Sequence, residues 1–172
     1  VAKRDVPFYL SVHYTAPHNP WIDGEHPAEI VALYEDCDFD DIPQGYIRDD
    51  AIYRYSPEDA RKCLQGYYAA ITAMDKNVGR IVETLDRLGL REDTLLVFTA
   101  DNGFNCGHHG LWGKGNATFS LNMYDTSVKV PLIINQPGYI KEGSVSHAMI
   151  SQYDYVPTLL EYCGIENPLT WK

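Results

Sequence analysis

Residues 95–115 of the sequence read LLVFTADNGFNCGHHGLWGKG. The apolar run at 94–100 is typical of a strand buried on both faces of a parallel sheet. It ends abruptly in Asp101 and Asn102, and a loop rich in glycine and histidine then leads to Lys114. Because open α/β sheets bind ligands at the carboxyl ends of their strands, we expect a site at this edge of the sheet.

On both sides of this stretch, predicted strands and helices alternate along the chain. Strands are predicted at 7–15, which is rich in aromatic and β-branched residues, and at 130–135, which is apolar. Helices are predicted at 57–88 and around 157–162, from their apolar spacing and flanking glycines. This order favours an α/β layered fold. We expect 7–15 and 94–100 to share one parallel or mostly parallel sheet.

The helix at 57–88 has clear signals at both ends. Ser56 is a good N-cap, and Gly89 suits the position just after the last turn. At 1.5 Å per residue the helix would be about 48 Å long. Gly66 and Gly79 are the places where a helix of this length is expected to bend or break.

Composition excludes several classes of protein. The 172 residues are 45% hydrophobic, which is enough for one domain with a core. The net charge of −10 argues against a nucleic-acid-binding protein, and no apolar run is long enough for a membrane span. The four cysteines form no CxxC pair, so they are interpreted as buried or incidental thiols, with disulfides left open. Residues 23–55 are acidic and without a period, as in a long surface excursion.

The residues at the expected sheet edge suggest a chemistry. The oxygen ligands of Asp101 and Asn102 suit Ca²⁺ or Mg²⁺ better than zinc, although Asp-Asn-Gly by itself is also a good turn. His18 follows the strand predicted at 7–15 and lies between two prolines. If the strands are neighbours, then His18, Lys114 and the cation ligands converge on a site for a tetrahedral oxyanion.

Five motifs in order now give a family resemblance: PFYLSVHYTAPHNPW, the segment from YYAAITAMDKNVG to FTADNG, GHHGLWGKG, DTSVKVPLII and SQYDYVPTLLEYCGI. Together they resemble the sulfatase family of the alkaline-phosphatase superfamily, over nearly the whole chain. The resemblance implies an alkaline-phosphatase-like fold with a mostly parallel central sheet flanked by helices. It also implies a sulfuric ester hydrolase acting on a small-molecule or carbohydrate sulfate ester.

The resemblance also assigns roles to residues. Asp101 and Asn102 match ligands of the family's divalent cation, usually calcium, with Mg²⁺ as the alternative. Lys114 matches the lysine that contacts the sulfate and the leaving oxygen. His18 matches a sulfate-binding histidine that helps to protonate the leaving group. His109 stands where many relatives have a histidine, for which substrate binding and packing of the loop are equally expected.

One family element has no counterpart in this sequence. The formylglycine nucleophile of sulfatases is made from Cys or Ser in a C/S-x-P/A-x-R motif, and no segment matches it. Two further carboxylate ligands are also missing. Residues 1–172 therefore resemble a single-domain fragment, the middle-to-late part of an arylsulfatase-like catalytic domain whose nucleophile-bearing front part is absent. We expect this fragment to be inactive alone, with that front part as its partner.

Two alternatives to a sulfatase remain open. A phosphonate or phosphodiester hydrolase of the same superfamily is one, although Asn102, in place of a histidine, favours sulfate esters. A non-catalytic fold or interaction fragment is the other. A periplasmic or secreted location is plausible for the family, but no signal in the sequence sets the compartment.

Overall fold

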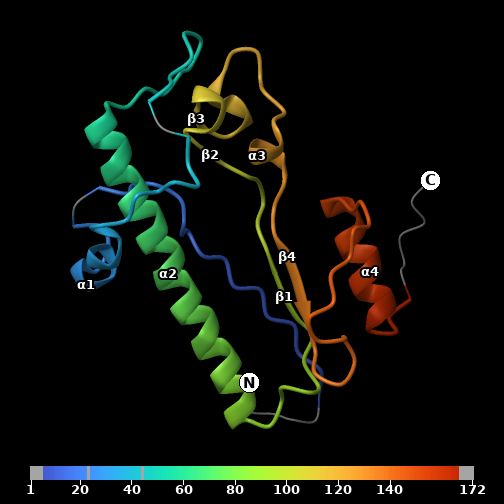
Figure 1. Ribbon diagram of the computed structural model, residues 1–172. Coiled ribbons are helices and arrows are strands. Elements are labelled where there is room, and N and C mark those ends of the chain that lie inside the picture. Colours follow the sequence, from blue (N-terminus) through green and yellow to red (C-terminus); the bar gives the residue numbers. More distant parts are fainter. Residues whose placement is uncertain (1–5, 23, 44, 167–172) are drawn as a thin grey trace. The chain divides into compact units, whose positions relative to one another are not determined.

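The computed structural model describes residues 6–22, 24–43 and 45–166 (Figure 1). The chain forms two compact units, Val1–Ile140 and Lys141–Lys172. In the first unit a long helix, two short β-ribbons and irregular segments surround the core, and the second unit carries one helix. No helix in the described part of the chain has the length and apolar character that a membrane span requires.

Helix α2, Pro57–Arg87, matches the predicted long helix. The Ser56 hydroxyl accepts a hydrogen bond from the Asp59 amide at 3.1 Å, which caps the first turn. At the other end Gly89 has a φ of 63°, and the Leu90 amide donates to the Leu85 carbonyl at 2.9 Å, as in a Schellman motif. The helix does not break at either internal glycine.

Strands β1, Leu96–Thr99, and β4, Leu132–Asn135, form the larger β-ribbon. They pair antiparallel, with Leu96 opposite Asn135 and Thr99 opposite Leu132. The predicted strand positions are confirmed, but the expected parallel arrangement is wrong for the sheets of the described residues, where both pairings are antiparallel. The loop between β1 and β4 returns the chain beside β1 in the opposite direction.

The prediction of a strand at 7–15 is also wrong for this structure. This segment has no regular secondary structure, and its side chains are exposed from Val6 to Tyr14. Composition predicted the strand, but an extended segment becomes a strand only when a neighbour takes up its backbone hydrogen bonds. No described strand pairs with it, since β1 is paired with β4.

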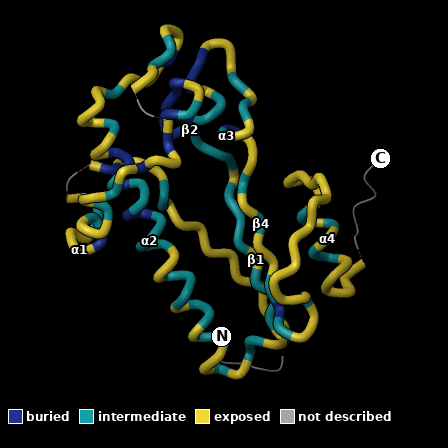
Figure 2. Tube along the Cα trace, in the orientation of Figure 1, coloured by how far each residue is buried: buried dark blue, intermediate teal, exposed yellow. Residues whose placement is uncertain are grey.

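The core lies beside the N-terminal half of α2, where the buried positions gather in Figure 2. Strands β2, Asn105–Cys106, and β3, Trp112–Gly113, form a short antiparallel hairpin above it. The buried core side chains are Trp21, Phe39, Ile42, Cys63, Leu64, Cys106 and Trp112. The loops that carry the sequence-predicted site residues are thus the same loops that build the core.

The remaining elements are short, as the sequence predicted. Helix α1, Ala28–Val31, and a 3₁₀ turn at Ala32–Tyr34 interrupt the acidic excursion. Helix α3, Asp125–Val128, precedes β4, and α4, Tyr155–Tyr162, forms the second unit. All four cysteines are unpaired, which confirms their interpretation as thiols.

Candidate functional site

Asp101 and Asn102 lie directly after β1. The Asp101 side chain is exposed, and its Oδ1 accepts the Asn102 amide at 2.9 Å, while Asn102 Nδ2 donates to the Gly103 carbonyl at 2.8 Å. Gly103 approaches α3 closely, because a Cβ there would lie 2.2 Å from the Thr126 carbonyl oxygen. The Gly103 amide donates to the Ser127 carbonyl at 3.0 Å. The Asp-Asn-Gly segment is therefore an ordered turn, locked against α3.

His18 lies on an exposed turn between Pro17 and Pro20. The His18 amide donates to the Thr15 carbonyl at 2.9 Å, and Nδ1 of the ring lies 2.9 Å from the Asn19 carbonyl oxygen. Because a carbonyl only accepts, Nδ1 carries a hydrogen.

Trp21 anchors this turn to the core. Its indole Nε1 donates to the Pro17 carbonyl at 2.8 Å, which fixes the segment that carries His18. The ring packs against Phe104, with centroids 5.2 Å apart, and against Trp112, with centroids 6.3 Å apart. The turn of His18 is thereby held beside the residues that follow Asp101 and the residues that precede Lys114.

Lys114 lies at the end of the hairpin of β2 and β3, and it is half-buried. Its carbonyl accepts the Ala117 amide at 2.9 Å and Nδ2 of Asn122 at 3.2 Å. Asn122 Nδ2 also lies 3.1 Å from the Gly115 carbonyl. The backbone of Lys114 is thus held on two sides, whereas its ammonium has no hydrogen-bond or ion-pair partner among the described residues.

A buried polar relay connects Asn122 to the core. The Ser127 hydroxyl donates to Asn122 Oδ1 at 2.6 Å and accepts from Asn105 Nδ2 at 2.7 Å. Asn105 is fully buried, and its Oδ1 accepts the Thr126 hydroxyl. A satisfied network of this kind rigidifies its surroundings. It joins β2, α3 and the loop after Lys114.

His109 is exposed and has a φ of 58°. Its ring stacks on Tyr124, with centroids 3.9 Å apart and planes 13° from parallel. The Tyr124 hydroxyl accepts a hydrogen bond from the Arg48 guanidinium at 2.7 Å. The structure therefore gives His109 a packing partner and connects it to the excursion at 23–55.

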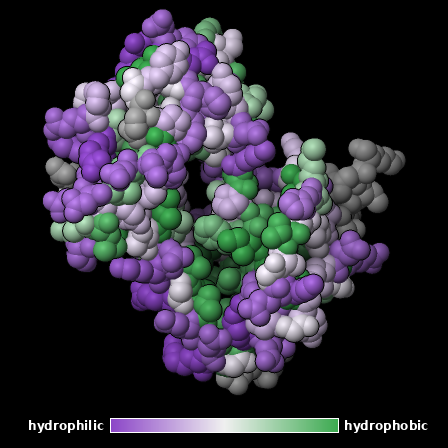
Figure 3. Space-filling model, in the orientation of Figure 1, coloured by the Kyte–Doolittle hydropathy of each residue, from purple (hydrophilic) through white to green (hydrophobic). Residues whose placement is uncertain are grey.

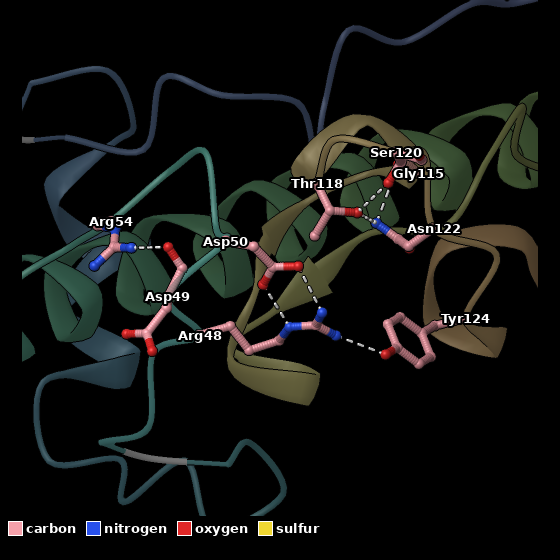
Figure 4. A network of polar contacts seen from close by, with 9 residues as sticks. All are labelled: Arg48, Asp49, Asp50, Arg54, Gly115, Thr118, Ser120, Asn122 and Tyr124. Carbon is pink, nitrogen blue, oxygen red and sulfur yellow. Dashed lines mark hydrogen bonds and ion pairs between the residues drawn. The ribbon is translucent and has the colours of Figure 1, made fainter.

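Arg48 is the centre of a polar network that sequence reasoning missed (Figure 4). Its guanidinium donates two hydrogen bonds to the Asp50 carboxylate, at 2.8 and 2.7 Å. These bonds hold the pKa of Asp50 below its usual range. Tyr124 is 76 positions away from Arg48 in the sequence, so no local pattern could have revealed their contact.

The donor chemistry at Asp101 and Asn102 fits a hard divalent cation only in part. A carboxylate and an amide oxygen are suitable ligands, but Ca²⁺ takes about six to eight oxygens. The described residues contain no group of three or more histidine, cysteine or acidic side chains that could hold a metal ion. Asp101 and Asn102 alone therefore fall short of a complete Ca²⁺ coordination shell.

The structure thus brings the loops together, but in the described part of the chain it shows no hydrogen bond or ion pair between the side chains of the candidate site residues. The segments of His18, Asp101 and Lys114 meet around the ring of Trp21. No hydrogen-bond or ion-pair partner reaches either His18 Nε2 or the Lys114 ammonium among the described residues. Their direct cooperation on a ligand stays a prediction.

Comparison with known proteins places the chain in a family. The family model described as Sulfatase matches residues 1–165. The chain is 37% identical over 105 residues to N-acetylglucosamine-6-O-sulfatase of Bacteroides thetaiotaomicron. This match covers 61% of the chain and 18% of that protein. It is 31% identical over 174 residues to choline-sulfatase of Rhizobium meliloti, and this match covers 92% of the chain and 32% of that protein.

Solved structures agree with the sequence comparisons. A Bacteroides fragilis protein assigned as the sulfatase yidJ has a TM-score of 0.69 and 32% identity, over 87% of this chain and 30% of that one. The phosphonate monoester hydrolase of Silicibacter pomeroyi has a TM-score of 0.59 and 33% identity, over 67% of this chain and 21% of that one. These neighbours confirm the predicted alkaline-phosphatase-like α/β fold. The chain spans about a third or less of the length of these relatives, and it belongs to the sulfatase family.

Proposed function

We propose that this chain is the latter part of a sulfatase catalytic domain, and that the complete protein hydrolyses a sulfate ester. The observation that carries the proposal is the packing of Trp21 against Phe104 and Trp112, which holds the turn of His18 beside the loops of Asp101 and Lys114. In this proposal the three loops, which come from distant parts of the sequence, bring a histidine, a carboxylate and a lysine to one region. The sulfatase family match supports the same reading.

In this proposal Lys114 and His18 bind the sulfate. The Lys114 ammonium would place a positive charge beside the sulfate oxygens, where negative charge develops in the transition state. Because Nδ1–H of His18 donates to the Asn19 carbonyl, Nε2 would be the ring nitrogen that protonates the leaving oxygen, and the ring would do so from its doubly protonated form. His109 would contact the substrate through its ring edge or the face that Tyr124 does not cover.

Asp101 and Asn102 are proposed as two ligands of the divalent cation that sulfatases generally use, with Ca²⁺ as the expected ion and Mg²⁺ as the alternative. When bound, such a cation polarises the attacking group and neutralises charge on the sulfate. The nucleophile, expected to be formylglycine, would belong to a front part of the domain that this chain lacks. The partners are then that front part and a small-molecule or carbohydrate sulfate ester.

The test compares this chain with the complete protein on an aryl sulfate. We expect the complete protein to release phenol and sulfate, and residues 1–172 alone to release none, because the covalent step has no nucleophile. Sulfatase turnover by the chain alone would contradict this assignment. Preferred turnover of a phosphonate monoester by the complete protein would favour the second candidate, which the similarity to the Silicibacter pomeroyi enzyme supports.

A further inference from the structure

A hollow of about 400 Å³ opens beside the loop that follows Lys114. It is lined by Arg48, Asp50 and residues 118–124, several of which Figure 4 shows as sticks. The hollow is shallow and open to solvent, so a ligand would lie against its surface and would not be enclosed. Asn122 lines the hollow and also donates to the Lys114 carbonyl, so the hollow adjoins the proposed sulfate-binding lysine.

The charges in this hollow cancel. Among the lining residues only Arg48 and Asp50 are charged, and they bind each other through two hydrogen bonds of 2.8 and 2.7 Å. A third hydrogen bond of the guanidinium, from Nη1, goes to the Tyr124 hydroxyl. An anionic ligand would find no unpaired cation here, and a cationic ligand would find no unpaired carboxylate.

Neutral hydrogen-bonding groups remain available. The Tyr124 hydroxyl accepts from Arg48, and its own hydrogen is left to donate. The Ser120 hydroxyl has no hydrogen-bond partner among the described residues, since only its backbone carbonyl is engaged, by Thr118. These hydroxyls suit the alcohol groups of a ligand, which both donate and accept.

The hollow also has an exposed apolar side. Phe119 is 92% exposed, and Leu121 and Met123 are exposed beside it. An aromatic ring held out to solvent offers a flat face for stacking. A ligand with one apolar face and a rim of hydroxyls would satisfy both sides of the hollow.

We propose that this hollow binds the uncharged, hydroxylated ring of a sulfated saccharide, which is the leaving-group part of the substrate. The inference deepens the proposed function and rests on it for the identity of the reaction. Phe119 stacks on the ring, while Ser120 and Tyr124 contact its hydroxyls. The Arg48–Asp50 pair selects against charged rings.

A binding experiment tests the hollow without requiring turnover. Calorimetry on the complete protein compares methyl N-acetylglucosaminide with methyl glucuronide, which carries a carboxylate, and with choline. We expect the neutral glycoside to bind best, and Phe119→Ala to weaken it about tenfold through lost stacking. Tyr139→Ala removes another exposed aromatic ring, 72% exposed and outside the hollow, and should change nothing.

A second variant tests the charge argument. Asp50→Asn leaves the Arg48 guanidinium without its carboxylate, so the glucuronide should bind more tightly in this variant, relative to the neutral glycoside, than in the wild type. A purely structural role for Asp50 would weaken both glycosides equally. Two results would overturn the inference: equally weakened binding of both glycosides in Asp50→Asn, or a wild type that binds the glucuronide more tightly than the neutral glycoside.

Kinetics separate this inference from the proposed function. With N-acetylglucosamine 6-sulfate, Phe119→Ala should raise KM about tenfold and leave inhibition by inorganic sulfate unchanged. If the wild type turns over sulfate esters but Phe119→Ala has no effect on any saccharide, the inference fails and the function stands. If the complete protein binds the glycoside in a way that depends on Phe119 but turns over no sulfate ester, the proposed sulfatase function is wrong and the saccharide-binding proposal is supported.

Discussion

Trp21 and Phe104 pack edge to face, with ring centroids 5.2 Å apart and planes at 82°. Trp21 also lies against α2, because a Cβ at Gly66 would be 2.1 Å from the Trp21 carbonyl oxygen. The turn of His18 is thus clamped between the long helix and the segment that follows Asp101. The absence of a side chain at Gly66 permits this approach.

Substitution at the two helix glycines should separate packing from helix propensity. Gly66→Ala must push the Trp21 backbone away, and we expect a loss of about 3 kcal/mol, the upper end for overpacking. Gly79→Ala is the matched control, because a Cβ there has no neighbour within 4 Å. It should stabilise the chain by about 0.5–1 kcal/mol. Urea denaturation followed by circular dichroism measures both, and equal effects would contradict the clamp.

Lys114→Ala in the complete protein should lower kcat about 10²–10³-fold, as expected for the loss of one oxyanion donor. Lys129→Ala is the control, since Lys129 is exposed and paired with Asp125 at 2.6 Å. Initial rates on an aryl sulfate measure both variants. An unchanged kcat in Lys114→Ala would remove this residue from the proposed site.

Calcium binding should depend on the complete protein. With one carboxylate and one amide, residues 1–172 alone should bind Ca²⁺ more weakly than micromolar, because carboxylate charge sets the affinity of such sites. In the complete protein, Asp101→Ala should reduce activity more than Lys114→Ala does, since the whole cation site is affected. Calorimetry on the isolated chain decides the first point, and micromolar binding there would be the contrary result.

The parts of this fold that were predictable are those specified by neighbours in the sequence. Ser56 and Gly89 mark the ends of α2 through contacts within a few residues, and the structure confirms both. Residues 7–15 have strand-like composition, but pairing depends on a partner that no local pattern reveals. The Arg48–Tyr124 bond was missed for the same reason, because it joins distant segments.

Within the candidate site, the sequence indicated which residues matter, but it did not indicate how they are arranged in space. Asp101 and Lys114 stood out because they follow an apolar run and a glycine-rich loop. Trp21 did not stand out, since a tryptophan after prolines has many ordinary explanations. Its role emerges only when Phe104 and Trp112 are brought to it by the fold.

Stability should fall at alkaline pH because of the buried thiols. Burial raises the pKa of Cys106 to about 12, and it also raises the pKa of Cys63. The unfolded chain releases these protons near the ordinary thiol pKa of about 8.5. The contribution is therefore complete below that pH and is lost as the pH rises towards 12. Denaturation midpoints measured between those values should decline less in Cys106→Ala than in the wild type.

The same burial should make the cysteines react unequally. At pH 9, iodoacetamide should modify the exposed Cys163 and leave Cys106 unmodified, as mass spectrometry of the digested protein would show. Rapid modification of Cys106 in the folded chain would contradict its protected position.

Residues 1–172 on their own should self-associate. Ile133, Ile134 and Val97 are exposed on β4 and β1, and Figure 3 shows apolar surface gathered where these strands lie. Each of the two strands has one strand partner in the described part of the chain, so no further strand lies along its other edge there. Light scattering should detect association that rises with concentration.

A charge on β4 should reduce this association. Ile133→Glu places a carboxylate on the apolar surface, whereas Leu33→Glu changes an exposed residue near α1 and serves as the control. A monomeric wild type at high concentration, or equal effects of the two variants, would count against the strand surface as the cause.

The closed loop after Lys114 has a consequence for how such proteins diversify. The Asn122 amide donates to the Gly115 carbonyl at 2.8 Å, so the two ends of the loop are fastened to each other. The buried Ser127 hydroxyl holds the Asn122 side chain from behind. Residues 119–121, which are exposed, can therefore vary in sequence while the position of Lys114 is kept.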